Sequence, residues 1–219
     1  MIEKADVRPG PDWDDVLARH LPPRHIARLR EASVGIAGAG GLGSSCAMLL
    51  VRSGIRRLRI ADPDMVDLSN LNRQFFFPDQ VGRAKVGALA ENLRALNPSL
   101  DLKLLQERLD GPAAASFFSG CDIVAEAVDS AASKQELVHA LLEAGHCVVA
   151  ASGMGGWGGD MHRRILGRLT VVGDFTAEVG PDRPALAPRV MMAAAMQADE
   201  IIRRILEGEE EDAGGRRTF

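Results

Sequence analysis

Residues 33–53 read SVGIAGAGGLGSSCAMLLVRS, and no other stretch constrains the expected fold as strongly. The apolar run Ser33–Ala37 predicts a strand, and Leu42–Ser53 predicts a helix with apolar residues along one face. Between them, the pattern G-x-G-x-x-G runs from Gly38 to Gly43. A strand, a glycine turn and a helix in this order are typical of the first unit of a parallel α/β sheet, with a phosphate site at the start of the helix.

The alternation of strand and helix continues along the chain. We expect further strands at Arg57–Ala61, Leu100–Leu105, Cys121–Val128 and Cys147–Ala151. We expect further helices at Arg83–Leu96, Ala113–Phe118, Ala132–Ala144 and Arg189–Leu206. A hairpin is expected before the last helix, from the short strands Arg164–Leu166 and Leu169–Val172. The predicted fold class is α/β: a Rossmann-like, mostly parallel sheet with helices on both faces and C-terminal antiparallel strands.

Composition is that of a soluble globular protein. The chain has 219 residues, of which 46% are hydrophobic and 26% charged, and its formal net charge is −4. No apolar run approaches the roughly 20 residues of a membrane span, and no secretory segment opens the sequence. The negative charge argues against nucleic acid as the main partner. Three widely spaced cysteines exclude a disulfide framework and paired C-x-x-C motifs, so we expect a cytoplasmic protein without zinc.

The glycine turn and the following strand predict a site for an adenosine nucleotide. Gly38, Gly40, Gly41 and Gly43 allow the backbone to approach a phosphate group closely, and the helix N-terminus supplies N–H donors. Asp62, at the end of the next predicted strand, is placed to bind a ribose hydroxyl. NAD and ATP both require these two features, so the glycine turn and Asp62 do not distinguish NAD from ATP.

The segment after Asp62 favours a triphosphate. Compared with NAD, ATP carries about two further negative charges, which require cations near its outer phosphates. Arg73 and Lys85 follow the second predicted strand and flank the expected crevice. Asp129, at the end of the predicted central strand, is placed to hold Mg²⁺ against the phosphates. These residues together favour ATP with Mg²⁺ over NAD.

Ordinary structural roles also account for some of these side chains. Arg73 could form an ion pair with Asp64 or Asp67 instead of binding a phosphate. Asp129 or the serine that follows it could cap the next helix, although a capping role does not exclude metal binding. Lys134, five residues after Asp129, is explained equally well as a ligand of the nucleotide and as a solvated helix residue.

Several segments, in this order, resemble a known family: GAGGLGSSCA, ADPDMVDLSNLNRQF, GRAKVGALAENLRALNP, AEAVDSAASK and AASGMGG. They resemble the adenylating enzymes of the ThiF/MoeB/HesA family, the bacterial relatives of ubiquitin-activating enzymes. The resemblance covers roughly residues 33–206, and the SNLNRQ segment with its downstream lysine is more specific than the glycine pattern. The stretches GIAGAGGLGS and APRVMMAAAMQAD are most like the short ThiF-type sulfur carrier protein adenylyltransferases of thiamine biosynthesis.

The resemblance implies an activity and a set of partners. Family members use ATP to adenylate the C-terminal Gly-Gly carboxylate of a small β-grasp sulfur carrier protein, usually as homodimers. We expect the same reaction here, with Mg²⁺ and in thiamine biosynthesis. Larger relatives capture the carrier on a cysteine, but residues 153–180 contain none, so we expect a separate protein to deliver the sulfur. Cys46, Cys121 and Cys147 are expected to be inert core residues.

The resemblance also implies a role for each site residue. The assignments are Gly41 along the phosphates, Asp62 on the ribose, Asn70 and Arg73 near the phosphates, Lys85 on the outer phosphates and Asp129 on the Mg²⁺. Relatives also bring an N-terminal arginine to the ATP across the dimer interface, for which the candidates are Arg19, Arg24 and Arg28. The glycine-rich segment 153–159, which contains Trp157, could form the channel for the Gly-Gly tail, or Trp157 could be an ordinary loop anchor.

The expected organisation follows from these assignments. Residues 1–32 form an N-terminal helical segment broken at Pro22-Pro23, residues 33–206 form the adenylating ATP-binding domain, and residues 207–219 form a disordered tail. Three alternatives remain open. They are an NAD-dependent oxidoreductase of Rossmann type, a relative that activates another carboxylate (on a molybdopterin carrier, a tRNA or a small molecule), and a non-catalytic module that binds carriers.

Overall fold

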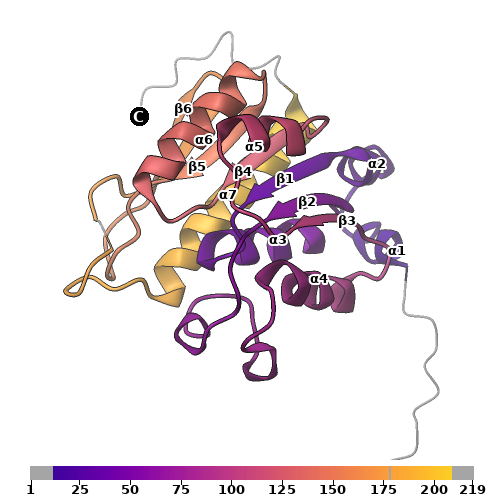
Figure 1. The fold of residues 1–219 in the computed structure, drawn as a ribbon. Coiled ribbons are helices and arrows are strands. Elements are labelled where there is room, and N and C mark those ends of the chain that lie inside the picture. Colours follow the sequence, from indigo (N-terminus) through magenta and orange to yellow (C-terminus); the bar gives the residue numbers. More distant parts are fainter. Residues whose placement is uncertain (1–11, 178, 209–219) are drawn as a thin grey trace, which may run out of the picture.

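A seven-stranded sheet forms the centre of the molecule in this computed structural model, which describes residues 12–177 and 179–208 (Figure 1). The strands are β1 (Ser33–Ala37), β2 (Arg57–Ala61), β3 (Asp101–Leu105), β4 (Ile123–Glu126), β5 (Cys147–Ala151), β6 (His162–Leu166) and β7 (Leu169–Gly173). Their order across the sheet is β3-β2-β1-β4-β5-β7-β6. Neighbouring strands are parallel except for β6 and β7, which form the antiparallel hairpin. The predicted α/β class is confirmed.

Helices cover both faces of the sheet (Figure 1). One face carries α3 (Gly41–Arg52), α4 (Lys85–Leu96) and α7 (Ala187–Glu207). The other face carries α5 (Gly111–Phe117) and α6 (Ala131–Glu143). The remaining helices are α1 (Trp13–Leu17), α2 (Pro23–Glu31) and the short 3₁₀ turns η1 (Leu68–Asn70) and η2 (Pro78–Gln80). The sheet therefore lies between two helical layers, as expected for parallel strands.

The apolar core follows this layering. Ile36, Leu50 and Ile201 are fully buried on the face of α3, α4 and α7, while Val124 and Leu141 are fully buried on the face of α5 and α6. Every residue of β4 and β5 is buried, which explains why both strands are almost continuous apolar runs in the sequence. The exception within these strands is a glutamate at the end of β4, which belongs to the site described below.

One predicted strand is too long. The sequence predicts Cys121–Val128, whereas β4 spans Ile123–Glu126. At its start, the Cys121 N–H donates to the Phe118 carbonyl and closes the turn after α5. At its end, the Val128 N–H donates to Glu126 Oε1. Cys121 and Ala127 are buried outside the strand, although the Ala127 N–H still donates to the Ala37 carbonyl of β1. A hydrophobic pattern alone does not separate such buried flanking residues from the strand itself.

The N-terminal segment contains two helices, α1 and α2, with the expected break at Pro22-Pro23. Pro23 is the first residue of α2, where the missing N–H costs no hydrogen bond. Residues 1–11 and 209–219 lie outside the described residues, and with them the first third of the N-terminal segment 1–32 and most of the tail expected at residues 207–219. Within the described part of the chain, no helix is both long enough and apolar enough for a membrane span.

The strand order creates a point at which two halves of the sheet diverge. The chain runs outward from β1 through β2 to β3, and then returns to the other side of β1 to continue through β4 and β5. In register, Ala37 of β1 lies opposite Ala61 of β2 and Glu126 of β4, so the three carboxyl ends are level. Open α/β sheets bind their ligands outside such ends, at the point of divergence.

Candidate active site

A crevice of about 780 Å³ lies at this point of divergence. It is lined by the turn after β1, the ends of β2, β4 and β5, the first turn of α6 and the start of α7. The residues of the crevice that the sequence singled out are Gly38, Gly40, Gly41, Asp62, Arg73, Lys85, Asp129 and Lys134. The fold therefore gathers eight side chains or glycines from segments up to 96 residues apart, a separation that runs from Gly38 to Lys134.

The glycine turn is built as an anion site. Gly38 has φ of +101°, and a Cβ there would lie 2.6 Å from the Ala127 carbonyl oxygen, so both conformation and space require glycine. A Cβ on Gly43 would lie 1.8 Å from the Gly38 carbonyl oxygen, so this glycine allows α3 to start close to β1. Among the described residues, no side chain caps α3 at Gly40. The N–H groups of its first turn are thus available to a phosphate in the crevice.

Asp62 holds the turn from the end of β2. It is buried, and its two carboxylate oxygens accept hydrogen bonds from the Ala39 N–H at 2.6 Å and the Asp64 N–H at 2.8 Å. Burial raises the pKa of Asp62, and the two backbone hydrogen bonds offset part of this rise. Each carboxylate oxygen can accept a second hydrogen bond, so the backbone contacts leave capacity for a ribose hydroxyl.

Two predicted cations reach the crevice from the segment between β2 and α4. Lys85 is buried, and its Nζ lies 2.8 Å from Asp64 Oδ2, while the Asp64 side chain is about half exposed. Arg73 Nη1 donates to the Ser69 carbonyl at 3.0 Å and to Asn72 Oδ1 at 2.8 Å. Among the described residues, Arg73 forms no ion pair with Asp64 or Asp67, so these alternatives are wrong: Asp64 pairs with Lys85, and Asp67 accepts hydrogen bonds from Ser69.

Asp129 lies beyond the end of β4 and is exposed at the crevice. The helix-capping role falls to Ser130, whose side chain accepts a hydrogen bond from the Ser133 N–H at 3.4 Å. Asp129 forms no hydrogen bond or ion pair with any other described residue. Within the described residues, no group of three His, Cys, Asp or Glu side chains could hold a metal ion by itself. A magnesium ion here would thus combine Asp129 with phosphate and water oxygens, which is its usual coordination in nucleotide sites.

Two predicted residues do not line the crevice among the residues described. Gly43 lies beneath it, where it packs α3 against the turn. Asn70 lies in η1, and its side-chain oxygen accepts a hydrogen bond from the Asp67 N–H at 3.1 Å. Asp67 in turn caps the same 3₁₀ turn through the Ser69 N–H. Asn70 thus shapes the segment that carries Arg73, and direct contact between Asn70 and a phosphate stays a prediction.

Lys134 is held in a way that the sequence did not reveal. Its Nζ is within hydrogen-bond distance of Glu126 Oε2 and 3.0 Å from the Ala151 carbonyl oxygen. The Glu126 side chain is fully buried, and 25% of the Lys134 side chain is exposed. Burial raises the pKa of Glu126, and the charge of Lys134 offsets part of this rise. The interpretation of Lys134 as a solvated helix residue is therefore wrong.

Sequence reasoning missed two residues of this region, Glu126 and Gln74. A single acid within the apolar run IVAEAV could have indicated Glu126, because a buried charge requires a partner. Gln74 lines the crevice, and its Oε1 is buried without a hydrogen-bond partner among the described residues. Nothing in the sequence distinguishes this glutamine from the polar residues around it. An orphaned buried acceptor next to the glycine turn is consistent with a donor from a bound ligand.

The glycine-rich segment 153–159 borders the crevice at the end of β5. Gly153 and Met154 line the crevice, and the Met154 N–H donates to the Ala177 carbonyl at 3.0 Å. Arg189, at the start of α7, is buried and contacts both the Gly158 carbonyl and Asp174. Trp157 is 71% exposed, so it is not a buried anchor of this loop. Its role in a tail channel stays a prediction.

The three cysteines are buried, as expected. Burial raises the pKa of the Cys46 thiol to about 12 and also raises the pKa of Cys121. Cys147 Sγ lies 3.7 Å from Arg204 Nη1 at the opposite edge of the sheet from the crevice. None of the three lines the crevice among the residues described. A nucleophilic thiolate at the crevice is therefore not available from these positions.

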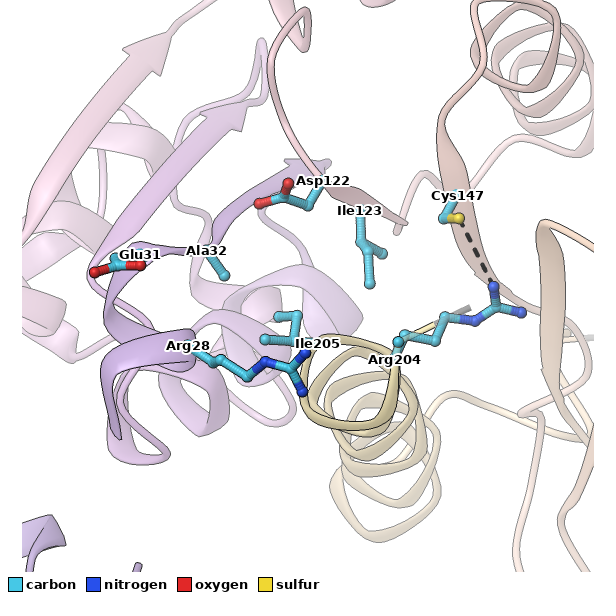
Figure 2. Close-up of a pocket in the computed structure, with 9 residues that line it drawn as sticks. Arg28, Glu31, Ala32, Asp122, Ile123, Cys147, Arg204 and Ile205 are labelled. Atoms are coloured by element: carbon cyan, nitrogen blue, oxygen red, sulfur yellow. Dashed lines mark hydrogen bonds between the residues drawn. The ribbon is translucent and has the colours of Figure 1, made fainter. Parts of the chain in front are cut away.

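A smaller cavity of about 420 Å³ lies at the amino ends of β4 and β5, and its lining includes Arg28, Asp122 and Arg204, with Arg204 pointing toward Cys147 (Figure 2). Arg28 contacts the Leu206 carbonyl of its own chain here, away from the crevice. Of the three candidate N-terminal arginines, Arg28 is thus bound at the far edge of the sheet. Which arginine, if any, acts across a dimer stays a prediction.

Comparison with known proteins agrees with this geometry. The sequence profile of the ThiF family matches residues 15–219. The sulfur carrier protein ThiS adenylyltransferase of Escherichia coli (strain K12) is 36% identical over 135 residues, which are 61% of this chain and 53% of that protein. Ubiquitin-like modifier-activating enzyme 5 of Arabidopsis thaliana is 50% identical over 76 residues, 35% of this chain and 18% of that protein. The chain thus spans about half, or less, of these relatives.

Solved structures show the same fold. The E. coli tRNA N6-threonylcarbamoyladenosine dehydratase TcdA, in complex with ATP, has a TM-score of 0.82 at 21% identity, covering 91% of this chain and 96% of that chain. E. coli MccB, in a structure with MccA-N7isoASN, has a TM-score of 0.66 at 21% identity, covering 84% and 59%. At such identities the likeness concerns the fold alone, whereas the sequence profile covers most of the chain. The chain belongs to the ThiF family.

Proposed function

We propose that this protein uses ATP and Mg²⁺ to adenylate the C-terminal Gly-Gly carboxylate of a small sulfur carrier protein. One observation carries the proposal: the crevice combines an uncapped helix N-terminus, four cationic side chains (Arg73, Lys85, Arg108 and Lys134) and the carboxylate of Asp129, which pairs with no other described residue. Its described lining includes no cysteine or histidine. Such a site is suited to position and neutralise phosphates rather than to supply a nucleophile or a base.

Each residue of the crevice would bind a different part of the nucleotide. The first turn of α3, at Gly40 and Gly41, would hold phosphate oxygens through N–H donors, and Asp62 would hold the ribose. Lys85 and Arg73 would bind the outer phosphates, with Lys85 exchanging its contact to Asp64 for a phosphate oxygen. Magnesium would be held by Asp129 and would neutralise phosphate charge. An NAD pyrophosphate bridge has no comparable need for these cations, so the set supports ATP.

The chemistry requires no base from the protein. A carboxylate is ionised at neutral pH. One of its oxygens forms a bond to the α-phosphorus while the bond from that phosphorus to the bridging oxygen breaks, and the electrons leave with pyrophosphate. No proton moves in this step. Catalysis thus consists of alignment and of reducing the repulsion between two anions, which matches the contents of the crevice.

Three arguments support a carrier protein as substrate. The sequence resembles ThiF-type enzymes, one relative is named for adenylating the sulfur carrier ThiS, and two others belong to ubiquitin-like activation. The glycine-rich segment 153–159, of which Gly153 and Met154 line the crevice, would leave room for a tail of glycines. We further propose a homodimer and action in thiamine biosynthesis, following the resemblance. We also propose a separate sulfur donor, because no cysteine belongs to the described crevice lining. The competing substrate class is a tRNA, because the name of TcdA refers to a modified tRNA.

ATP–pyrophosphate exchange tests the proposal. Exchange should depend on a ThiS-type carrier with a free Gly-Gly terminus and should be absent with the same carrier lacking its last glycine. Exchange supported by a threonylcarbamoyl-modified tRNA, and not by the carrier, would move the substrate to the competing class. Tight NADH binding with no exchange under any condition would overturn adenylation itself.

A further inference from the structure

The order of the strands across the sheet fixes the order in which the site residues lie along the crevice. From β2 to β5 come Asp62, the glycine turn, Asp129 and, between β4 and β5, Lys134. The proposed phosphate-binding cations Arg73 and Lys85 belong to the layer of α3 and α4. Lys134 comes from α6, in the opposite layer, and lies against the end of β5. It is thus separated from the other cations by the sheet edge and lies next to the glycine-rich segment.

The position of Lys134 is unfavourable for a cation unless another group compensates. It is the fourth residue of α6, close to the positive end of the helix dipole. The structure supplies Glu126, a fully buried carboxylate that also accepts a hydrogen bond from the Val128 N–H at 2.8 Å. A buried ion pair of this kind contributes little net stability compared with apolar packing. Its presence therefore calls for another explanation.

The ammonium group retains a free donor. Of its three N–H groups, one is directed to Glu126 and one to the Ala151 carbonyl. These two contacts fix Nζ between β4 and β5, where Lys134 lines the crevice together with Ser152 and Gly153. The third N–H is available to an acceptor in the crevice. The other cationic residues of the described crevice lining are Arg73, Lys85 and Arg108, which lies in the loop after β3.

We propose that Lys134 binds the acyl end of the reaction, that is, the carboxylate before adenylation and the acyl oxygen afterwards, and that Glu126 is its positioning residue. The proposal rests on the adenylation function proposed above. Lys134 would reduce the repulsion between the incoming carboxylate and the triphosphate, while Arg73 and Lys85 hold the leaving pyrophosphate. Because Lys134 carries its charge on the carrier side, its loss should affect acyl recognition more than nucleotide recognition.

Calorimetric titration with two probes tests this assignment. AMP occupies only the nucleotide part of the crevice, whereas 5′-O-(glycylglycylsulfamoyl)adenosine adds a non-reactive Gly-Gly acyl group. We expect Lys134→Met to weaken binding of the Gly-Gly probe about 10- to 100-fold and AMP binding less than threefold, since a charge-assisted hydrogen bond is lost. Lys134→Arg should restore part of the loss. The matched control Lys103→Met, on β3 outside the crevice lining, should bind both probes as the wild type does.

A second variant separates recognition from folding. Lys134→Met leaves Glu126 buried and unpaired, so the double variant Glu126→Gln/Lys134→Met removes both charges and should show the same selective loss. Equal weakening of both probes in the folded double variant, or no weakening, would overturn the inference while leaving adenylation intact. Failure of the wild-type protein to bind either probe would instead overturn the adenylation function, and this inference with it.

Discussion

Two glutamates of the described part of the chain are buried beside cations, and the two differ in what surrounds them. Glu200 of α7 is fully buried and bound by Arg163, Arg203, Arg204 and Thr170, which come from α7, β6 and β7. Burial alone would raise its pKa, but the hydrogen bonds from the arginines outweigh burial and lower it to about 2. Among the described residues, Glu126 forms an ion pair with Lys134 alone, and burial raises the pKa of Glu126.

The difference separates a structural cluster from a functional pair. Every oxygen of Glu200 is used to join α7 to the β6–β7 hairpin. The charge of that cluster is neutralised by several cations. None of its residues lines the larger crevice in the described part of the chain, although Arg204 lines the smaller cavity at the amino ends of β4 and β5. The Glu126 pair keeps one N–H of its lysine directed toward a crevice. Burial of a carboxylate therefore does not by itself indicate a function. A function is indicated when the cation paired with it keeps an N–H group for an acceptor in a crevice.

The largest expected effect concerns the crevice. Lys85→Ala and Asp129→Ala should each lower carrier-dependent exchange about 10²- to 10³-fold, the usual cost of losing one group that stabilises a transition-state charge. The matched control Lys103→Ala, outside the described crevice lining, should keep full activity. Exchange rates, measured beside circular dichroism spectra, check the prediction. An exchange rate near that of the wild type in Lys85→Ala would contradict the assignment of Lys85 to the outer phosphates of ATP.

The cluster around Glu200 should matter for stability and not for binding. Glu200→Gln should lower the free energy of unfolding at pH 7 by about 3 kcal/mol or more, as when one partner of a buried ionic group is removed. Glu207→Gln is the matched control: Glu207 contacts Arg203 at 3.1 Å with its side chain 47% exposed, so its loss should cost less than about 1 kcal/mol. Urea unfolding of both variants provides the measurement.

The pH dependence of this effect has a definite sign. The pKa of Glu200 is lowered from 4.5 to about 2 on folding, so its contribution is complete above pH 4.5 and is lost as pH falls toward 2. The difference in unfolding free energy between the wild type and Glu200→Gln should therefore shrink between these values. A difference that stays constant down to pH 3 would show that the charge of Glu200 is not the source of the stability.

A smaller loss is expected beneath the crevice. Gly43→Ala places a Cβ 1.8 Å from the Gly38 carbonyl oxygen, and the backbone must move. We expect about 1–3 kcal/mol of destabilisation, typical of overpacking, together with weaker ATP binding. Gly87→Ala, in α4 with no heavy atom within 4 Å of the new Cβ, should instead be neutral or stabilising. Thermal unfolding of the pair checks this, and equal behaviour of both variants would contradict the close packing.

The smallest effect is expected from the thiols. A variant with Cys46, Cys121 and Cys147 all changed to Ala should keep carrier-dependent exchange within about twofold per folded molecule, because the thiols are buried away from the crevice. Stability should fall, since small cavities replace buried sulfur atoms. Loss of exchange in a folded variant, or a carrier thioester detected by mass spectrometry in the wild type, would contradict a reaction without covalent capture.

Short-range patterns in the amino-acid sequence are enough to predict much of the candidate site. The glycine turn, Asp62, Lys85 and Asp129 follow strands that the hydrophobic periodicity already located, and parallel strands bring their carboxyl ends together. Glu126 and Lys134 could not be paired in this way, because their contact depends on how α6 packs against β4. The same holds for Glu200, whose partner Arg163 lies 37 residues away on an edge strand. Asn70 illustrates a third case, in which the same polar pattern fits a ligand contact and a local turn.

The central claim is that the crevice binds a triphosphate, and titration of ATP, AMP and NADH with Mg²⁺ present tests it most directly. We expect the wild-type protein to bind ATP more tightly than NADH, and we expect Lys85→Ala to weaken ATP binding at least tenfold more than AMP binding. Tighter binding of NADH, or equal weakening of ATP and AMP by Lys85→Ala, would contradict it.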